Sequence, residues 1–128
     1  MEIIGNGVDI IKNSRIKKLI KNPKFISRIF SKNEINDSKK IKNKTNFFAK
    51  RFAAKEAFVK AIGIGLRKGI NFNDIYIKNN KLGKPTISFN KNVKKILNKK
   101  FKSDRFNVYV SLSDEKQYSI AYVIINKL

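Results

Sequence analysis

The chain has 128 residues, the size of one domain spanning residues 1–128, and it contains neither cysteine nor histidine. Disulfides, thiol catalysis and Ser-His-type triads are therefore excluded, and the most common zinc ligand is missing. Lysine supplies most of the 30 basic residues, which outnumber the 9 acids and give a formal net charge of +21. Such a surface attracts nucleic acid, anionic lipid, phosphorylated ligands and acidic proteins. Genome bias explains part of this charge equally well, because lysine, asparagine and isoleucine share A/T-rich codons.

No apolar run reaches the ~20 residues that a membrane span needs. A signal peptide has a basic segment ahead of its apolar residues, and the opening stretch MEIIGNGVDII has none. We therefore expect a cytoplasmic protein without membrane contact.

The first predicted element is a strand in the stretch EIIGNGVDII, where side chains alternate between two faces. One face carries Ile4, Val8 and Ile10. The other face carries Gly5, Gly7 and Asp9. Two glycines beside an acid leave a bare backbone surface that another group can approach closely. An ordinary edge strand with a bulge is the alternative.

Three short helices are predicted to follow this strand. The basic segment NSRIKKLIK forms the first, capped by Asn13 or Ser14. The segment NPKFISRIF forms the second, with Pro23 at its first helical position. The segment SKNE, residues 31–34, is a capping box that opens the third.

A long helix is predicted from Thr45 or Asn46 to about Ile62, and the glycines of GIGLRKG end it because they adopt left-handed conformations. At 100° per residue, its apolar residues form one core-facing stripe. That stripe consists of Phe48, Phe52, Val59 and Ile62. Lys55 falls inside it, so its ammonium either extends outward along its stem or lies at the edge of a pocket.

After this helix, the spacing of apolar residues changes from the helical period to the alternation of a strand. Residues 74–80 and 86–89 are predicted to form a hairpin around the turn KLGKP. The segment NKNVKKILNKK is an amphipathic helix with Val93, Ile96 and Leu97 inward. Two apolar strands, FNVYVSLS and YSIAYVII, follow, joined by the turn DEKQ. These elements predict an α+β domain, with a largely antiparallel sheet packed against one long helix and several short helices.

Glu56 is the single acid of the long helix, and Lys60 follows it one turn later. A surface ion pair between the two is the simplest interpretation. The alternative begins with Asp9, a second isolated acid on a glycine-lined strand. If the strand and the helix meet, the two carboxylates would hold Mg²⁺, which usually takes one or two carboxylates plus substrate phosphates. Lys55 and Lys60 would then neutralise those phosphates.

Three segments, GNGVDIIKNSRI, RFAAKEAFVKAIGIG and VYVSLSDEKQYSIAYVII, resemble the holo-acyl-carrier-protein synthases, the small single-domain branch of the 4′-phosphopantetheinyl transferases. The turn KLGKP also lies where that family has a Gly-Lys-Pro turn. The resemblance spans nearly the whole chain in order. It implies transfer of 4′-phosphopantetheine from coenzyme A to a serine of apo-acyl-carrier protein, with release of adenosine 3′,5′-bisphosphate. It also implies a homotrimer with active sites between neighbouring subunits.

The resemblance assigns roles to individual residues. Asp9 and Glu56 would hold the metal ion, and Lys60 would contact the phosphates of coenzyme A. Gly63 and Gly65 would let the backbone approach the cofactor. Arg15 would grip the acidic carrier protein, whose charge complements the basic first helix. The nucleophile is the partner's serine, and Glu56, directly or through a water molecule, is the candidate proton acceptor.

One position departs from the family pattern. The C-terminal motif commonly ends in histidine, and this chain reads SLSD, with Asp114 at that position. A carboxylate there would repel a phosphate, so either this position lies away from coenzyme A, or Lys116 or another lysine offsets its charge. A weak or inactive family member is a further alternative.

Two other classes of protein compete with a transferase. A small basic RNA-binding protein would need basic residues interleaved with exposed aromatics, and the phenylalanines here follow the spacing of a core. A metal-dependent nuclease using Asp9 and Glu56 usually needs a third or fourth acid. We therefore expect no nucleic-acid partner.

Overall fold

The computed structural model describes residues 1–64 and 69–128 and has the α+β architecture that the sequence predicts. The helices are α1 (Asn13–Leu19), α2 (Pro23–Ile29), α3 (Lys32–Ser38), α4 (Lys44–Ile62) and α5 (Lys91–Phe101), with a 3₁₀ turn, η2 (Phe72–Asp74). The strands are β1 (Glu2–Lys12), β2 (Ile75–Asn79), β3 (Pro85–Phe89), β4 (Phe106–Asp114) and β5 (Tyr118–Lys127).

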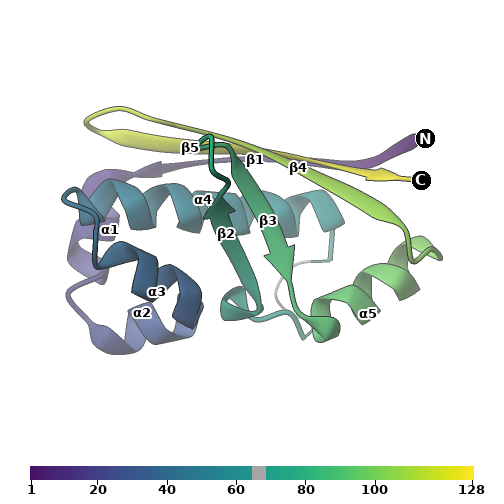
Figure 1. Ribbon diagram of the computed structural model, residues 1–128, viewed down its shortest axis with the longest axis horizontal. Coiled ribbons are helices and arrows are strands. Elements are labelled where there is room, and N and C mark those ends of the chain that lie inside the picture. The colour runs from purple at the N-terminus through teal and green to yellow at the C-terminus, as the bar shows by residue number, and fades with distance from the viewer. Residues whose placement is uncertain (65–68) are drawn as a thin grey trace.

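The strands form two antiparallel sheets. The larger has the order β1-β5-β4, and β2 pairs with β3 in a separate hairpin. Helix α4 packs along one face of the larger sheet, and the short helices and the hairpin lie beyond it, so only one face of that sheet is covered (Figure 1).

The core lies between α4 and the larger sheet and extends toward the hairpin. The predicted stripe of α4 is buried, and so are the alanines on its neighbouring side. Val93 and Leu97 of α5 are buried as predicted, while Ile96 is half-buried. Helical spacing of apolar residues therefore identified the packed faces of both helices correctly.

Local end signals are largely confirmed. Pro23 lies in the first turn of α2, and Ser31 forms the predicted capping box with Glu34. The cap predicted for α1 is wrong, because Lys12 is at that position and no side chain caps the helix. The carboxamide of Asn13 instead donates to the carbonyl oxygens of Glu115 and Lys116, which ties α1 to the turn between β4 and β5.

Candidate active site

The bare face of β1 lies directly against α4. A Cβ atom placed on Gly7 would be 2.0 Å from the carbonyl oxygen of Ala57, and one on Gly5 would be 2.1 Å from that of Ala61. Both distances are far below van der Waals contact, so only glycine permits this approach. The approach predicted for this face is therefore made by a helix backbone. β1 is also an edge strand, and its register shifts between Ile3 and Gly5.

This contact brings the predicted acid of the strand beside the basic side chain of the helix. The Lys60 ammonium donates to Asp9 Oδ1 and to the carbonyl oxygen of Val8, both at 3.1 Å. The Lys60 side chain is 54% exposed, whereas that of Asp9 is 16% exposed. The lysine therefore reaches back from solvent onto a largely enclosed carboxylate.

Glu56 shares this electrostatic environment. Burial raises the pKa of Glu56 above its ordinary value, and the charge of Asp9 raises it further. The cations Lys60 and Arg15 oppose this shift in pKa. The strand and the helix thus meet with their two carboxylates close enough to interact, and Arg15 of α1 lies within range of the same group.

The structure corrects the prediction for Lys55, which is fully buried on another side of α4. Its ammonium contacts the Glu34 carboxylate and donates to the carbonyl oxygens of Ile29 and Phe72, at 2.7 and 3.0 Å. Burial lowers the pKa of Lys55 to about 8, against the influence of Glu34. With its ammonium enclosed and bonded in this way, Lys55 is not available to neutralise substrate phosphates.

Glu34, the partner of Lys55, was predicted from the sequence as part of a capping box and not as a buried residue. Glu34 is buried, and its carboxylate also accepts from the backbone N–H groups of Ser31 and Ile77. The capping box revealed the first of these bonds in the sequence, but a cap is usually exposed. The contacts of Glu34 join α3, α4 and β2.

The glycines that follow α4 are only partly described. Gly63 ends the helix in the left-handed conformation, with φ of 84°, and among the described residues no atom lies within 4 Å of a Cβ atom placed there. Gly65 lies outside the described residues.

Asp114 is paired within the chain. Asn46 donates to its Oδ2 at 2.8 Å, and the Lys50 ammonium lies 3.5 Å from its Oδ1. Both partners come from the first half of α4. Of the two explanations that the sequence offered, compensation by another lysine is therefore supported, with Lys50 in that role.

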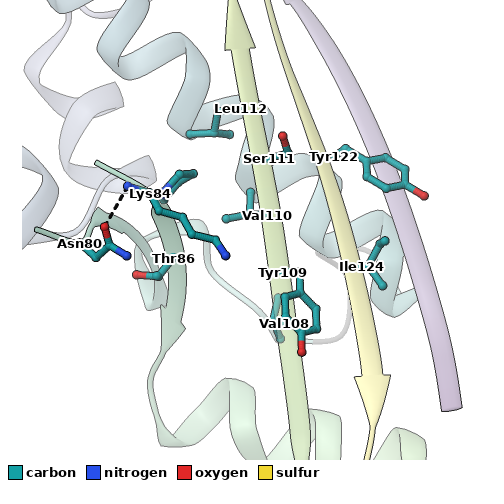
Figure 2. Close-up of a pocket in the computed structure, with 11 residues that line it drawn as sticks. Asn80, Lys84, Thr86, Val108, Tyr109, Val110, Ser111, Leu112, Tyr122 and Ile124 are labelled. Carbon is teal, nitrogen blue, oxygen red and sulfur yellow. Dashed lines mark hydrogen bonds between the residues drawn. The ribbon is translucent and has the colours of Figure 1, made fainter. Parts of the chain in front are cut away.

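The surface of the chain has two hollows that involve β1, β4 and β5. A small one beside Lys60 is lined by Asn6, Gly7, Val8 and Tyr122. A larger groove of about 610 Å³ separates the hairpin from β4. In Figure 2, Lys84 and Thr86 lie on the hairpin side of this groove, and Tyr122 and Ile124 lie across β4 on the outer side of the sheet. Tyr122 lines both hollows.

The uncovered face of the larger sheet carries exposed large apolar side chains beside exposed polar ones such as Asn6 and Ser111. The apolar ones come from all three strands of that sheet. They are Val8, Ile10, Tyr109, Tyr118, Ile120 and Tyr122. An apolar surface of this kind on a folded domain indicates an interface.

The donor set suits a magnesium ion that shares its coordination with a substrate. Within residues 1–64 and 69–128, no group of three or more acidic side chains converges. Two carboxylates, Asp9 and Glu56, match the usual protein contribution to a Mg²⁺ site in which phosphates and water complete the shell. They do not match the larger acid set of a two-metal nuclease. Asp9 already pairs with one cation of the chain, the ammonium of Lys60.

Comparison with known proteins shows the family and the fold. The chain belongs to the 4′-phosphopantetheinyl transferase superfamily, whose family model matches residues 5–123. It is 56% identical, over 99% of both chains, to a holo-[acyl-carrier-protein] synthase of Pelagibacter ubique. The structure of the Neisseria meningitidis holo-[acyl-carrier-protein] synthase matches with a TM-score of 0.88 and 37% identity, covering 98% of this chain and 99% of that one.

A further solved structure carries a bound coenzyme. The Helicobacter pylori holo-[acyl-carrier-protein] synthase in complex with coenzyme A matches with a TM-score of 0.80 and 31% identity, covering 94% of this chain and 99% of that chain. The fold and the family expected from the sequence are therefore confirmed. In the part of the chain that the structure describes, no helix has the length and apolarity of a membrane span.

Proposed function

We propose that this enzyme transfers the 4′-phosphopantetheine arm of coenzyme A to a serine of an acidic apo-acyl-carrier protein. The observation that carries the proposal is the contact of β1 with α4, which brings Asp9 and Glu56 into electrostatic range of each other with Lys60 beside them. The serine oxygen forms a bond to phosphorus, and the bond to the bridging diphosphate oxygen breaks. Adenosine 3′,5′-bisphosphate leaves.

Asp9 and Glu56 would hold Mg²⁺. When bound, Mg²⁺ would polarise the phosphorus under attack and offset charge on the leaving group. The enclosed position of Asp9 favours a fixed carboxylate, which is what a preorganised site requires.

Lys60 supplies further positive charge to the diphosphate. Its side chain is more than half exposed and lines the hollow beside β1. Charge accumulates on the bridging oxygen as the bond to phosphorus breaks, and a cation placed there stabilises the transition state. We propose that Gly63 and Gly65 let the backbone approach the same cofactor, as the family resemblance implies.

Glu56 is the proposed acceptor of the serine proton. Burial and Asp9 raise its pKa, which brings the carboxyl nearer to the pH at which a general base works well. The proton would pass to Glu56 directly or through one water molecule.

Arg15 and the lysines of α1 form the proposed carrier-protein surface. Arg15, Lys17 and Lys18 are all exposed, and Arg15 lies close enough to influence the pKa of Glu56. A carrier protein bound to this helix would therefore bring its serine toward the site. Complementary charge speeds such an encounter and is screened by salt, so transfer efficiency should fall steeply as ionic strength rises.

We propose a homotrimer that assembles through the apolar outer face of the larger sheet. That face is uncovered in the single chain, and the groove between the hairpin and β4 opens beside it (Figure 2). Packing against a neighbour would cover both and would place active sites between subunits. We also propose that the enzyme works in the cytoplasm, as the sequence led us to expect.

The test is incubation with coenzyme A, Mg²⁺ and apo-acyl-carrier protein, followed by intact-protein mass spectrometry. Addition of the phosphopantetheine arm is expected, and it should disappear in Glu56→Gln while circular dichroism shows a folded domain. Absence of transfer by the wild-type chain, or full transfer by Glu56→Gln, would refute the proposed reaction or the role of Glu56, respectively.

A further inference from the structure

Lys60 occupies the position of a cation at Asp9. Its ammonium contacts one carboxylate oxygen and the carbonyl oxygen of Val8, each at 3.1 Å. Oxygen atoms of these two kinds are also the ligands that hard metal ions take from proteins. The ammonium therefore occupies Asp9 Oδ1, an oxygen atom that the proposed metal ion would also use, and brings a single positive charge to it.

The ammonium and a divalent ion would compete for the same oxygen atom. Mg²⁺ binds its ligands at about 2.0–2.1 Å and demands near-ideal octahedral geometry. A lysine donating to Asp9 Oδ1 would place a second positive charge against that ion. Entry of the metal therefore favours departure of Lys60.

Lys60 has freedom to leave, whereas Asp9 does not. The Lys60 side chain is 54% exposed at the edge of α4, and the Asp9 side chain is 16% exposed beneath it. Lys60 itself lines the hollow formed with Asn6, Gly7 and Tyr122. An anionic group bound in that hollow would therefore be within reach of the ammonium.

From these contacts we propose that Lys60 is an exchangeable counter-ion, which holds Asp9 in the metal-free enzyme and moves to the diphosphate of the substrate when a divalent ion takes Asp9. This inference rests on the proposed function. The ammonium of Lys60 would thus have two partners in succession, Asp9 and then the diphosphate. Before the metal binds, it would neutralise the charge of the Asp9 carboxylate. Removing the ammonium should then strengthen metal binding, because the ion no longer has to displace it.

The experiment measures Mn²⁺ binding by electron paramagnetic resonance, in the absence of coenzyme A. Wild type, Lys60→Met, Asp9→Asn and Lys40→Met are compared, since Lys40 is an exposed residue just after α3 and controls for the loss of one charge. Lys60→Met should bind Mn²⁺ about two- to five-fold more tightly than wild type, the range expected for loss of a competing exposed ion pair. Lys40→Met should stay close to wild type.

The outcomes separate the two levels of the proposal. If Lys60→Met remains folded by circular dichroism but binds Mn²⁺ no more tightly than wild type or Lys40→Met, the exchange is refuted while the metal site stands. If Asp9→Asn binds Mn²⁺ as well as wild type, the metal site itself is refuted and the exchange with it.

Discussion

Replacing Gly7 with alanine tests the contact on which the site depends. The added Cβ atom would be 2.0 Å from the carbonyl oxygen of Ala57 and 2.9 Å from the backbone nitrogen of Ala61. Ordinary contact begins near 3.4 Å, so β1 and α4 would have to separate by roughly 1.4 Å, the difference between the two distances. The obstructing atoms belong to the backbone, and no side-chain rotation relieves the clash.

The expected effects are on both stability and activity. Overpacking of this kind costs about 1–3 kcal/mol or more of unfolding free energy, which for a domain of this size lowers the melting temperature by roughly 3–15 °C. Because β1 carries Asp9 and α4 carries Glu56, their separation should also weaken metal binding. A displacement of ~1 Å at a catalytic site can reduce kcat/KM by about 100-fold.

The measurements are differential scanning calorimetry, Mn²⁺ binding and the transfer assay. Gly83→Ala is the control for stability and metal binding, because Gly83 has φ of 85° and, in the described parts of the chain, no atom lies within 4 Å of an added Cβ. It should lose only the strain of a left-handed alanine, about 1 kcal/mol. A Gly7→Ala protein that melts within 1 °C of wild type, with unchanged Mn²⁺ affinity, would refute the packing described for β1 and α4.

Three further predictions concern single groups. In the metal-free chain, Glu56 should titrate above the ordinary range of a glutamate, and carboxyl ¹³C NMR should show its pKa falling in Asp9→Asn, since Asp9 raises it; an unchanged pKa would contradict the assignment. A raised folded-state pKa means that the contribution of Glu56 to stability is present at low pH and is lost as pH rises through that pKa. Glu34→Gln should lower the unfolding free energy in urea by about 3–5 kcal/mol, because a buried Lys55 ammonium loses its carboxylate; the double variant with Lys55→Met should recover part of the loss, and a loss below ~1 kcal/mol would show that the pair is not desolvated. Tyr122→Glu should reduce the oligomer to monomers in multi-angle light scattering, and an unchanged mass would exclude the outer sheet face as the interface.

The sequence predicted those features whose signals are local. The spacing of apolar residues identified the buried face of α4, and Ser31 with Glu34 identified the start of α3. These signals act over one or two helical turns, and the residues that carry them also make the contacts. Local patterns of this kind therefore transfer directly from sequence to structure.

The sequence did not predict contacts between residues that lie far apart along the chain. Lys55 was correctly placed within the core stripe, but its partner Glu34 is 21 positions away in the sequence, and nothing near Lys55 points to it. Asn13 has the chemistry of a helix cap, yet its carboxamide binds backbone more than 100 positions away. The glycines of β1 predicted a close approach without showing that α4 would make it. In each case the residue type was informative and the partner was set by the fold.

Helix α4 combines a fixed acid with a mobile cation because its two sides are restrained differently. On one side the glycine backbone of β1 fits against it without a side chain between them, and on another side the buried pair of Lys55 with Glu34 fastens it to α3 and β2. Neither contact can adjust without loss of packing, so the position of Glu56 between them is held by the core. Lys60 extends from the same helix into solvent, and within residues 1–64 and 69–128 its ammonium donates two hydrogen bonds. Preorganised carboxylates favour capture of a metal ion, whereas a cation that must follow charge from one partner to another needs the freedom that an exposed lysine retains.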